Sequence, residues 1–242
     1  MTVATSKIDE TLLISIERPP VNALDLDAIA ELKQAFATAA REMPQGGVVL
    51  TGGGDVFSAG VDTRAFASYS GEQRHAMVQA ITHMVAQLLA IAVPVVAAVN
   101  GHALGGGFVL MLALMLACDY RMGVDREAAK LGMTEAQAGI PFPIGPLEVI
   151  RHELSPELLR RMALTSAVLG MRELQGSRAI DELCAVEDLR SKALAKAKRL
   201  AAQPAFRTVK RQIRGGLAQR VALLASSGQD ALLEEFGQSP LT

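Results

Sequence analysis

The stretch VPVVAAVNGHALGGGFV, residues 93–109, decides the fold. Its apolar β-branched beginning, residues 93–99, predicts a buried strand, which the Asn100-Gly101 pair ends. Gly105, Gly106 and Gly107 then open a long apolar helix. Glycine lets a ligand approach the backbone closely, and the N-terminus of a helix presents unpaired N–H groups with a partial positive charge. The segment is therefore suited to holding an oxyanion or a phosphate, although a glycine triple is also typical of a plain turn.

Composition sets limits on the class of protein. The chain has 242 residues, of which 50% are hydrophobic and 20% are charged, and its net charge is −1. This balance is typical of a globular protein and gives no basic field for nucleic acid. Cys118 and Cys184 are too few for a disulfide framework and lack the CxxC spacing of a metal site, so we expect no metal. The longest apolar run, residues 108–118, is too short to cross a membrane, and residues 1–10 lack an apolar signal core, so we expect a cytoplasmic protein.

Strands and helices alternate in the first part of the chain, which predicts an α/β fold. We expect strands at residues 11–17, 47–51, 93–99 and 119–123, helices at 26–42 and 77–91, and a polar, mobile stretch at 68–74. From Ser155 onward the pattern predicts almost only helices. We therefore place a boundary at Leu154, between a core of residues 1–154 and a helical C-terminal region of residues 155–242.

A second strand-to-loop junction, residues 50–62, also carries glycine. If it lies beside residues 99–108, each junction can offer one backbone N–H to the same carbonyl oxygen. Two such donors would stabilise an enolate, in which negative charge develops on oxygen. Neither junction has the GxxxxGK[ST] or GxGxxG pattern of a nucleotide site.

Five motifs together resemble the crotonase (enoyl-CoA hydratase/isomerase) superfamily. In chain order they are RPPVNALD (18–25), FSAGVD (57–62), VNGHALGGG (99–107), ACDYRM (117–122) and LGMTEAQAGIPF (131–142). The resemblance covers nearly the whole chain. It implies a spiral of ββα repeats followed by C-terminal helices that assemble a homotrimer or a dimer of trimers. It also implies an acyl-CoA thioester as substrate, with no metal or nicotinamide cofactor.

The resemblance assigns roles to particular residues. The backbone N–H groups of Val61 and Gly106 would form the oxyanion hole. The expected CoA contacts are Asn22, Ala23, Leu24, Ala59, Gly60, Asp62, Gly105 and, from the basic C-terminal helices, Lys210. A solvated helix face is the alternative explanation for Lys210 and its basic neighbours.

The catalytic carboxylates decide the reaction. Hydratases of this family use two glutamates; one position is Val109 here, and the other is Glu135. A single buried carboxylate can move a proton from C2 to C4, so the pattern favours a Δ3,Δ2-enoyl-CoA isomerase. Three alternatives remain: a hydratase with Glu135 alone or with an unidentified second acid, a weakly active acyl-CoA-binding subunit, and a structural Glu135 that begins a helix capped by Thr134.

One departure from the family is a tandem repeat, LMLALMLA, at residues 110–117. Four residues advance a helix by about one turn, so we expect a helix that is one turn longer and keeps its buried face. The extra turn either leaves Gly106 in place or shifts the oxyanion loop.

Overall fold

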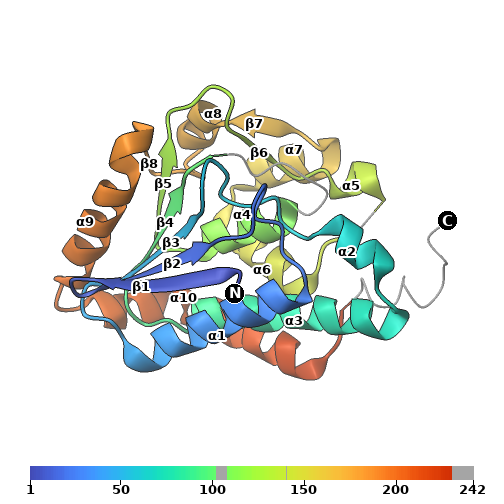
Figure 1. The fold of residues 1–242 in the computed structure, drawn as a ribbon, viewed down its shortest axis with the longest axis horizontal. Coiled ribbons are helices and arrows are strands. Elements are labelled where there is room, and N and C mark those ends of the chain that lie inside the picture. The colour runs from blue at the N-terminus through green and yellow to red at the C-terminus, as the bar shows by residue number, and fades with distance from the viewer. Residues whose placement is uncertain (102–107, 140, 231–242) are drawn as a thin grey trace.

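The computed structural model describes residues 1–101, 108–139 and 141–230. Within these residues, six strands form one sheet in the order β1-β2-β3-β4-β5-β8 (Figure 1). The strands are β1 (Val3–Ile8), β2 (Thr11–Ile16), β3 (Val48–Gly52), β4 (Val95–Val99), β5 (Tyr120–Val124) and β8 (Glu182–Cys184). Strands β1 and β2 pair antiparallel, and every other neighbouring pair is parallel.

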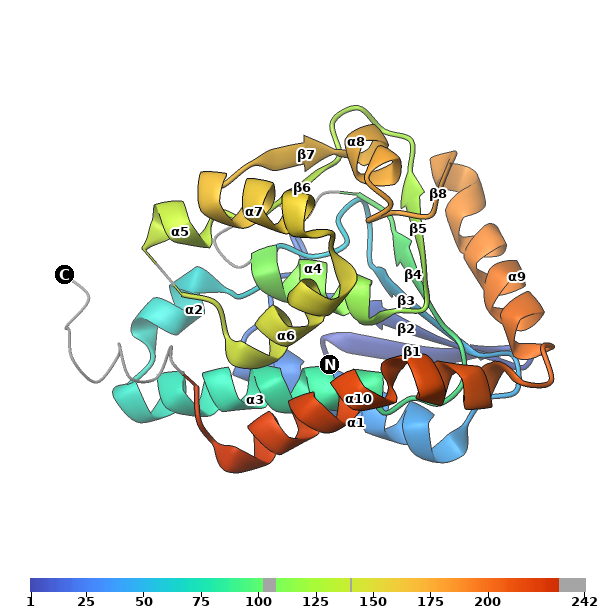
Figure 2. The same ribbon diagram turned by 180° about the vertical axis from the view of Figure 1, so that it is seen from behind.

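The central strands are mostly apolar because helices cover both faces of the sheet. Every residue of β4 is buried, and Val48 to Leu50 of β3 are fully buried. Helix α9 (Leu189–Ala201) lies on one face, and α1 (Leu26–Glu42), α3 (Gly71–Leu89) and α4 (Phe108–Ala117) lie on the other side (Figures 1 and 2).

The predicted helix at residues 26–42 is confirmed as α1. Asp25 precedes it in an extended conformation, and its side chain accepts a hydrogen bond from the Ala28 N–H, which satisfies a donor of the first turn. Ile29, Leu32 and Phe36 recur at helical spacing and are fully buried.

The stretch predicted to be polar and mobile contains the end of one helix and the start of another. Helix α2 (Thr63–Ser68) ends there, and α3 begins at Gly71 rather than at Met77. Ser70 and Gln73 form a capping box, in which each side chain accepts a hydrogen bond from the other residue's backbone N–H. The S-x-x-Q spacing signals such a helix start, whereas a polar composition alone indicates only exposure.

Helix α4 contains the tandem repeat and is buried on all sides. From Val109 to Ala117 no side chain is more than 3% exposed. The repeat therefore lies in an interior helix, which packs against α6 (Ile144–Glu153) and α3. The chain then turns at Cys118 and Asp119 into β5. Gly105 and Gly106 lie outside the described residues.

From Ser155 onward the described chain is mainly helical, as expected, with α7 (Pro156–Thr165), α8 (Met171–Gly176), α9 and α10 (Phe206–Ser227), but it also contains short strands. The short helix α5 (Glu135–Ala138) precedes this region. Strand β6 (Lys130–Gly132) pairs antiparallel with β7 (Val168–Gly170), and β8 extends the main sheet beside β5. The boundary at Leu154 thus does not divide a sheet from a helical region. Three-residue strands are too short to show an alternating pattern, so the sequence did not reveal them.

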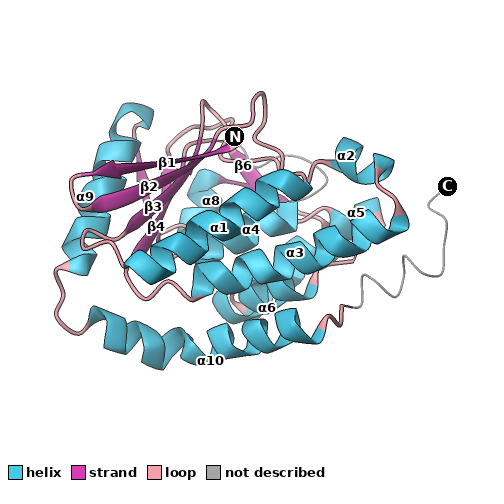
Figure 3. Ribbon diagram, turned by 60° about the horizontal axis from the view of Figure 1, so that its bottom comes forward, coloured by secondary structure: helices cyan, strands magenta, loops and turns pink. Residues whose placement is uncertain are grey.

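The C-terminal helix α10 runs along α3 and α6 (Figure 3). This places the C-terminal helix against the same subunit's core. Among the described residues, no helix is long and apolar enough to cross a membrane.

Candidate active site

The described start of the second glycine-bearing junction, at Asn100 and Gly101, lies beside the first junction. Asn100, which follows β4, donates from its side-chain amide to the carbonyl oxygens of Gly52 (3.0 Å) and Gly54 (2.7 Å). Its Oδ1 accepts from the Gly52 N–H at 3.2 Å. The carboxyl ends of parallel strands meet at one edge of a sheet, and Asn100 ties the β3 loop to the end of β4 there.

The next residue, Gly101, explains why this junction needs glycine. A Cβ atom at this position would lie 1.7 Å from the carbonyl oxygen of Asp55. The two loops therefore pack backbone against backbone, at a distance that no other residue permits.

Asn22 holds the β3 loop from the other side. Its amide donates to the carbonyl oxygens of Gly53 (2.9 Å) and Val56 (2.7 Å), and the Ser58 hydroxyl donates to the Asn22 carbonyl. The side chain is buried, so it is committed to the loop. These hydrogen bonds give the Asn22 side chain a positioning role, and its predicted contact with CoA stays a prediction.

Val61 has the backbone geometry of an oxyanion donor. It pairs with Leu24 in an isolated parallel bridge, in which Leu24 donates to the Gly60 carbonyl (2.6 Å) and accepts from the Asp62 N–H (2.8 Å). Since hydrogen-bonding directions alternate along an extended chain, the Val61 N–H points away from Leu24. It has no hydrogen-bond partner in the described part of the chain. Gly60 beside it has φ +75°, which favours glycine.

The other predicted contacts divide into buried and accessible residues. Leu24 is fully buried and Ala59 is 8% exposed, so their side chains belong to the core and only their backbone faces the loop. Ala23 is half-buried. Asp62 caps α2 and pairs with Arg18 at 2.7 Å. Hydrogen bonding from the Ala65 N–H, and then from Arg18, lowers the pKa of Asp62.

Sequence reasoning assigned no role to Arg18, although it opens the first motif. Its guanidinium contacts Asp25 at 2.8 Å and Asp62 at 2.7 Å. It also donates to the Ala23 carbonyl at 2.8 Å, and so joins the loop before α1 to the start of α2. Arg18, Asp25 and Asp62 all lie in the quoted motifs, but their pairing depends on the fold and is not visible in the sequence.

Glu135 is a buried carboxylate at the start of α5 and is 3% exposed. Its Oε1 accepts a hydrogen bond from the backbone N–H of Val109, at 2.8 Å. Its Oε2 is buried and has no hydrogen-bond partner among the described residues. Burial raises the pKa of Glu135, and the Val109 N–H opposes part of that rise.

This geometry differs from a simple helix start. Thr134 makes no side-chain capping hydrogen bond to α5. The Glu135 carboxylate instead reaches the first turn of α4, where unpaired N–H groups carry partial positive charge. No lysine, arginine or histidine of the described chain forms an ion pair with it. The site therefore contains a carboxylate that is desolvated, oriented through one oxygen and left with the other oxygen unpaired.

Lys210, which was predicted to contact CoA, lies at the edge of the sheet opposite the glycine-bearing loops and forms an ion pair there. Its ammonium donates to Asp119 Oδ2 at 2.6 Å and to the Val93 carbonyl at 3.0 Å. Val93 precedes β4 and Asp119 precedes β5, so Lys210 sits at the amino ends of these strands. Burial lowers the pKa of Lys210, and the Asp119 carboxylate opposes that shift.

The remaining chemistry is limited. Within the described ranges, no group of three or more His, Cys, Asp or Glu side chains is placed to hold a metal ion. Cys118 and Cys184 are both buried thiols. Burial raises the pKa of Cys118 to about 12.

Comparison with known proteins identifies the family of this chain. The enoyl-CoA hydratase/isomerase family model matches residues 8–239. The probable enoyl-CoA hydratase EchA17 of Mycobacterium tuberculosis is 30% identical over 77% of this chain and 69% of its own length. The glyoxysomal fatty acid beta-oxidation multifunctional protein MFP-a of Cucumis sativus is 31% identical over 78% of this chain, and the match spans only 26% of that protein.

The fold is also that of solved structures of this class. Human mitochondrial delta3-delta2-enoyl-CoA isomerase superposes with a TM-score of 0.87 at 22% identity, covering 98% of this chain and 93% of the human one. The chain belongs to the enoyl-CoA hydratase/isomerase family and has the crotonase fold.

Proposed function

We propose that this protein isomerises 3-enoyl-CoA to trans-2-enoyl-CoA, with Glu135 as the only acid–base group. The observation that carries the proposal is the 2.8 Å hydrogen bond between the Val109 N–H and Glu135. It brings together the two positions at which hydratases of the family have glutamates. Here one position holds a carboxylate, and the other holds a valine that is 3% exposed.

The reaction balances with one base. Ionised Glu135 removes a proton from C2, and the resulting dienolate carries its negative charge on the thioester oxygen. Backbone N–H groups of Val61 and, by resemblance, Gly106 stabilise that oxygen. Protonated Glu135 then returns the proton to C4, so the double bond moves from C3 to C2 and no water is consumed.

The two oxygens of Glu135 divide this work. Oε1 is held by Val109, which fixes the orientation of the carboxylate. Oε2 is the atom with no partner in the described structure, so it is the one that exchanges the proton. The raised pKa of Glu135 brings the acid and base forms closer in free energy near neutral pH, as proton transfer in both directions requires.

An apolar cavity beside this segment can receive the acyl chain. It has a volume of about 380 Å³ and is lined by Met133, Phe142, Leu147, Ile150 and Leu159, among others. One lining residue, Met133, lies two residues before Glu135 in the chain. We assign it to the hydrocarbon part of the substrate.

Hydration of 2-enoyl-CoA is the second candidate, and the name of the EchA17 relative favours it. Hydration needs a water that is both positioned and deprotonated while a proton is delivered to C2. A single carboxylate with one oxygen already bonded to a backbone N–H serves this less well than two glutamates do.

NMR of substrates in deuterated water tests the proposal. A 3-enoyl-CoA and a 2-enoyl-CoA are incubated separately with the wild type, Glu135→Gln and the exposed control Glu157→Gln. We expect the 3-enoyl substrate to be converted by the wild type and the control, and not by Glu135→Gln. Formation of 3-hydroxyacyl-CoA from the 2-enoyl substrate at a comparable rate would establish a hydratase instead. No reaction and no deuterium uptake with either substrate would favour an acyl-CoA-binding protein.

A further inference from the structure

Helix α10 carries an unusual stripe of basic side chains. Arg207, Lys210, Arg211 and Arg214 are spaced i, i+3, i+4 and i+7, which places them on one face of the helix. This spacing normally marks the apolar stripe that faces a core. Like charges one turn apart destabilise a helix, so the stripe calls for anionic partners.

Carboxylates of the core neutralise half of this stripe. Asp119 lies 2.6 Å from the Lys210 ammonium and 3.6 Å from Arg214, and Glu153 lies 2.8 Å from Arg214. In contrast, no carboxylate of the described residues pairs with Arg207 or Arg211. The recorded contact of Arg207 is a long one, 3.9 Å, to the sulfur of Met43.

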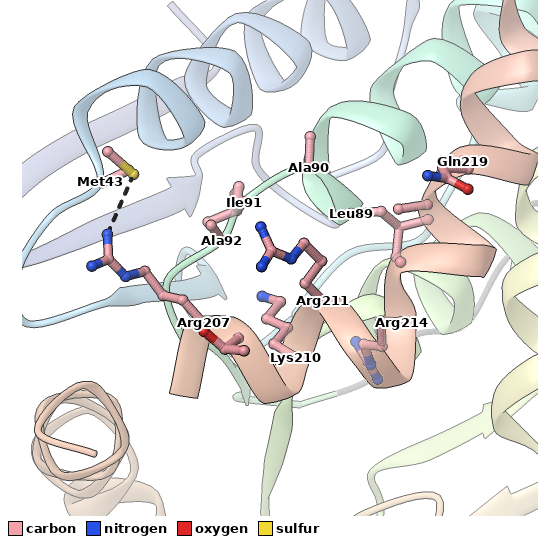
Figure 4. Close-up of a pocket in the computed structure, with 13 residues that line it drawn as sticks. Met43, Leu89, Ala90, Ile91, Ala92, Arg207, Lys210, Arg211, Arg214 and Gln219 are labelled. Carbon is pink, nitrogen blue, oxygen red and sulfur yellow. Dashed lines mark hydrogen bonds between the residues drawn. The ribbon is translucent and has the colours of Figure 1, made fainter. Parts of the chain in front are cut away.

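The two unpaired arginines line a pocket of about 510 Å³ (Figure 4). Its opposite wall is the connection between α3 and β4, with Leu89, Ile91 and Ala92, and Met43 closes one end. In Figure 4, Arg207 points toward Met43 and Arg211 extends toward Ile91 and Ala92, whereas Arg214 turns away from that wall. The pocket therefore combines two guanidinium groups with an apolar surface.

The first turn of α10 adds to the positive potential. It contains no acidic residue, and Ala205, at the N-cap position, offers no side-chain acceptor. The first turn therefore supplies no carboxylate of its own to offset the partial positive charge of the helix N-terminus. A guanidinium group is planar and can donate two parallel hydrogen bonds to the oxygens of one phosphate.

We propose that this pocket binds a small phosphate-bearing anion, a diphosphate or a phosphate ester, between Arg207 and Arg211. The site is separate from the acyl-CoA site. The apolar wall of the pocket lies before β4 in the chain, whereas Asn100 and the two loops that it joins lie after β4. The strand has five residues, so at about 3.3 Å per residue the two places lie about 15 Å apart. The proposal does not depend on which reaction Glu135 performs.

A purely structural explanation predicts a different result. The carboxyl end of α3, at Leu89 and Ala90, also borders the pocket and carries partial negative charge. If the arginines serve only to stabilise that helix end, removing them lowers stability and no anion binds.

Isothermal titration calorimetry of the full chain with sodium pyrophosphate separates the two explanations. The proteins are the wild type, Arg207→Gln/Arg211→Gln, and the charge-matched control Arg190→Gln/Arg199→Gln on α9. We expect binding to the wild type and the control, and a loss of at least about tenfold in affinity per pocket arginine. Absence of binding to the wild type at millimolar pyrophosphate, or equal binding to both double variants, would overturn the proposal.

Two further arms identify the source of the phosphates and separate this site from catalysis. Adenosine 3′,5′-bisphosphate, the nucleotide portion of CoA, is titrated beside pyrophosphate, and the KM for acyl-CoA is measured in both double variants. We expect the KM to be unchanged; a selective rise in Arg207→Gln/Arg211→Gln would make the pocket part of the CoA site and refute its independence. Glu135→Gln should bind pyrophosphate as the wild type does, so failure of the isomerase proposal leaves this result interpretable.

Discussion

Buried carboxylates lie at both ends of the parallel strands, but the groups that contact them differ between the two ends. At the carboxyl end, Glu135 meets the Val109 N–H and no cation of the described chain. At the amino end, Asp119 pairs with Lys210 and Arg214, and Glu153 pairs with Arg214 and Arg121.

The difference separates reactivity from structure. At the amino end, the ion pairs of these carboxylates with Lys210 and Arg214 fix α10 to the core. A buried carboxylate without a cation has a raised pKa and remains able to exchange a proton. The same side-chain chemistry thus serves cohesion at one end of the sheet and, in the proposed reaction, proton transfer at the other.

The largest expected effect is on activity, at the carboxyl end. Replacing Glu135 with Gln keeps its shape and removes the proton acceptor, so we expect kcat to fall by about 10²–10⁴-fold. The unfolding free energy should not fall, because the change removes a poorly solvated charge. Kinetics with a 3-enoyl-CoA and thermal unfolding measure the two effects. A variant that loses stability and activity together would assign Glu135 to the structure.

The next effect is on stability, at the amino end. Lys210→Met removes one partner of a buried ion pair, so we expect a loss of about 3 kcal/mol in the free energy of unfolding. Activity per folded molecule should be retained, since Lys210 lies away from the catalytic loops. Urea unfolding of this variant beside Lys192→Met, an exposed lysine of α9, measures the difference. Equal stability of the two variants would show that the buried pair does not hold α10 in place.

A smaller effect is expected where Asn100 joins the two loops. Asn100→Ala leaves the Gly52 and Gly54 carbonyls without their amide donor, which costs about 1–3 kcal/mol of stability. A loop shift of about 1 Å would also reduce kcat by up to about 10²-fold. The comparison is with Asn100→Asp, which keeps the acceptor for the Gly52 N–H and loses the donors. Full activity in both variants would mean that other contacts position the oxyanion loop.

The smallest expected effect is the pH dependence of stability and of kcat/KM that Glu135 causes. The folded state binds the Glu135 proton more tightly than the unfolded state does, because burial raises its pKa above 4.5. Stability therefore falls as pH rises from about that value through the raised pKa, and Glu135→Gln should lack this fall. Over the same window kcat/KM should rise with pH, since catalysis requires the ionised base.

Unfolding and rate measurements from pH 4 to 8 on the wild type and Glu135→Gln check this sign. An acid limb of kcat/KM at or below pH 4.5 would show that Glu135 is well solvated when it reacts, and the contrast with the paired carboxylates would disappear.

Local patterns predicted much of the fold. The helix at residues 26–42 and the strands at the two glycine junctions were readable because each has a continuous period of apolar residues. Strand β8 and the start of α3 were not, since one is three residues long and the other begins with polar residues in a capping box. The antiparallel edge strand β1 was also missed, because most of its residues are exposed.

The sequence by itself determined the family, the loop that carries Val61 and the presence of a single glutamate at the two expected catalytic positions. Tertiary structure decided the rest. Glu135 meets Val109 across 26 residues, and Lys210 meets Asp119 across 91. Burial and pairing arise from such distant contacts, which sequence spacing does not encode. That is why the sequence did not reveal that Lys210 forms a buried ion pair with Asp119, or that Oε2 of Glu135 has no hydrogen-bond partner among the described residues.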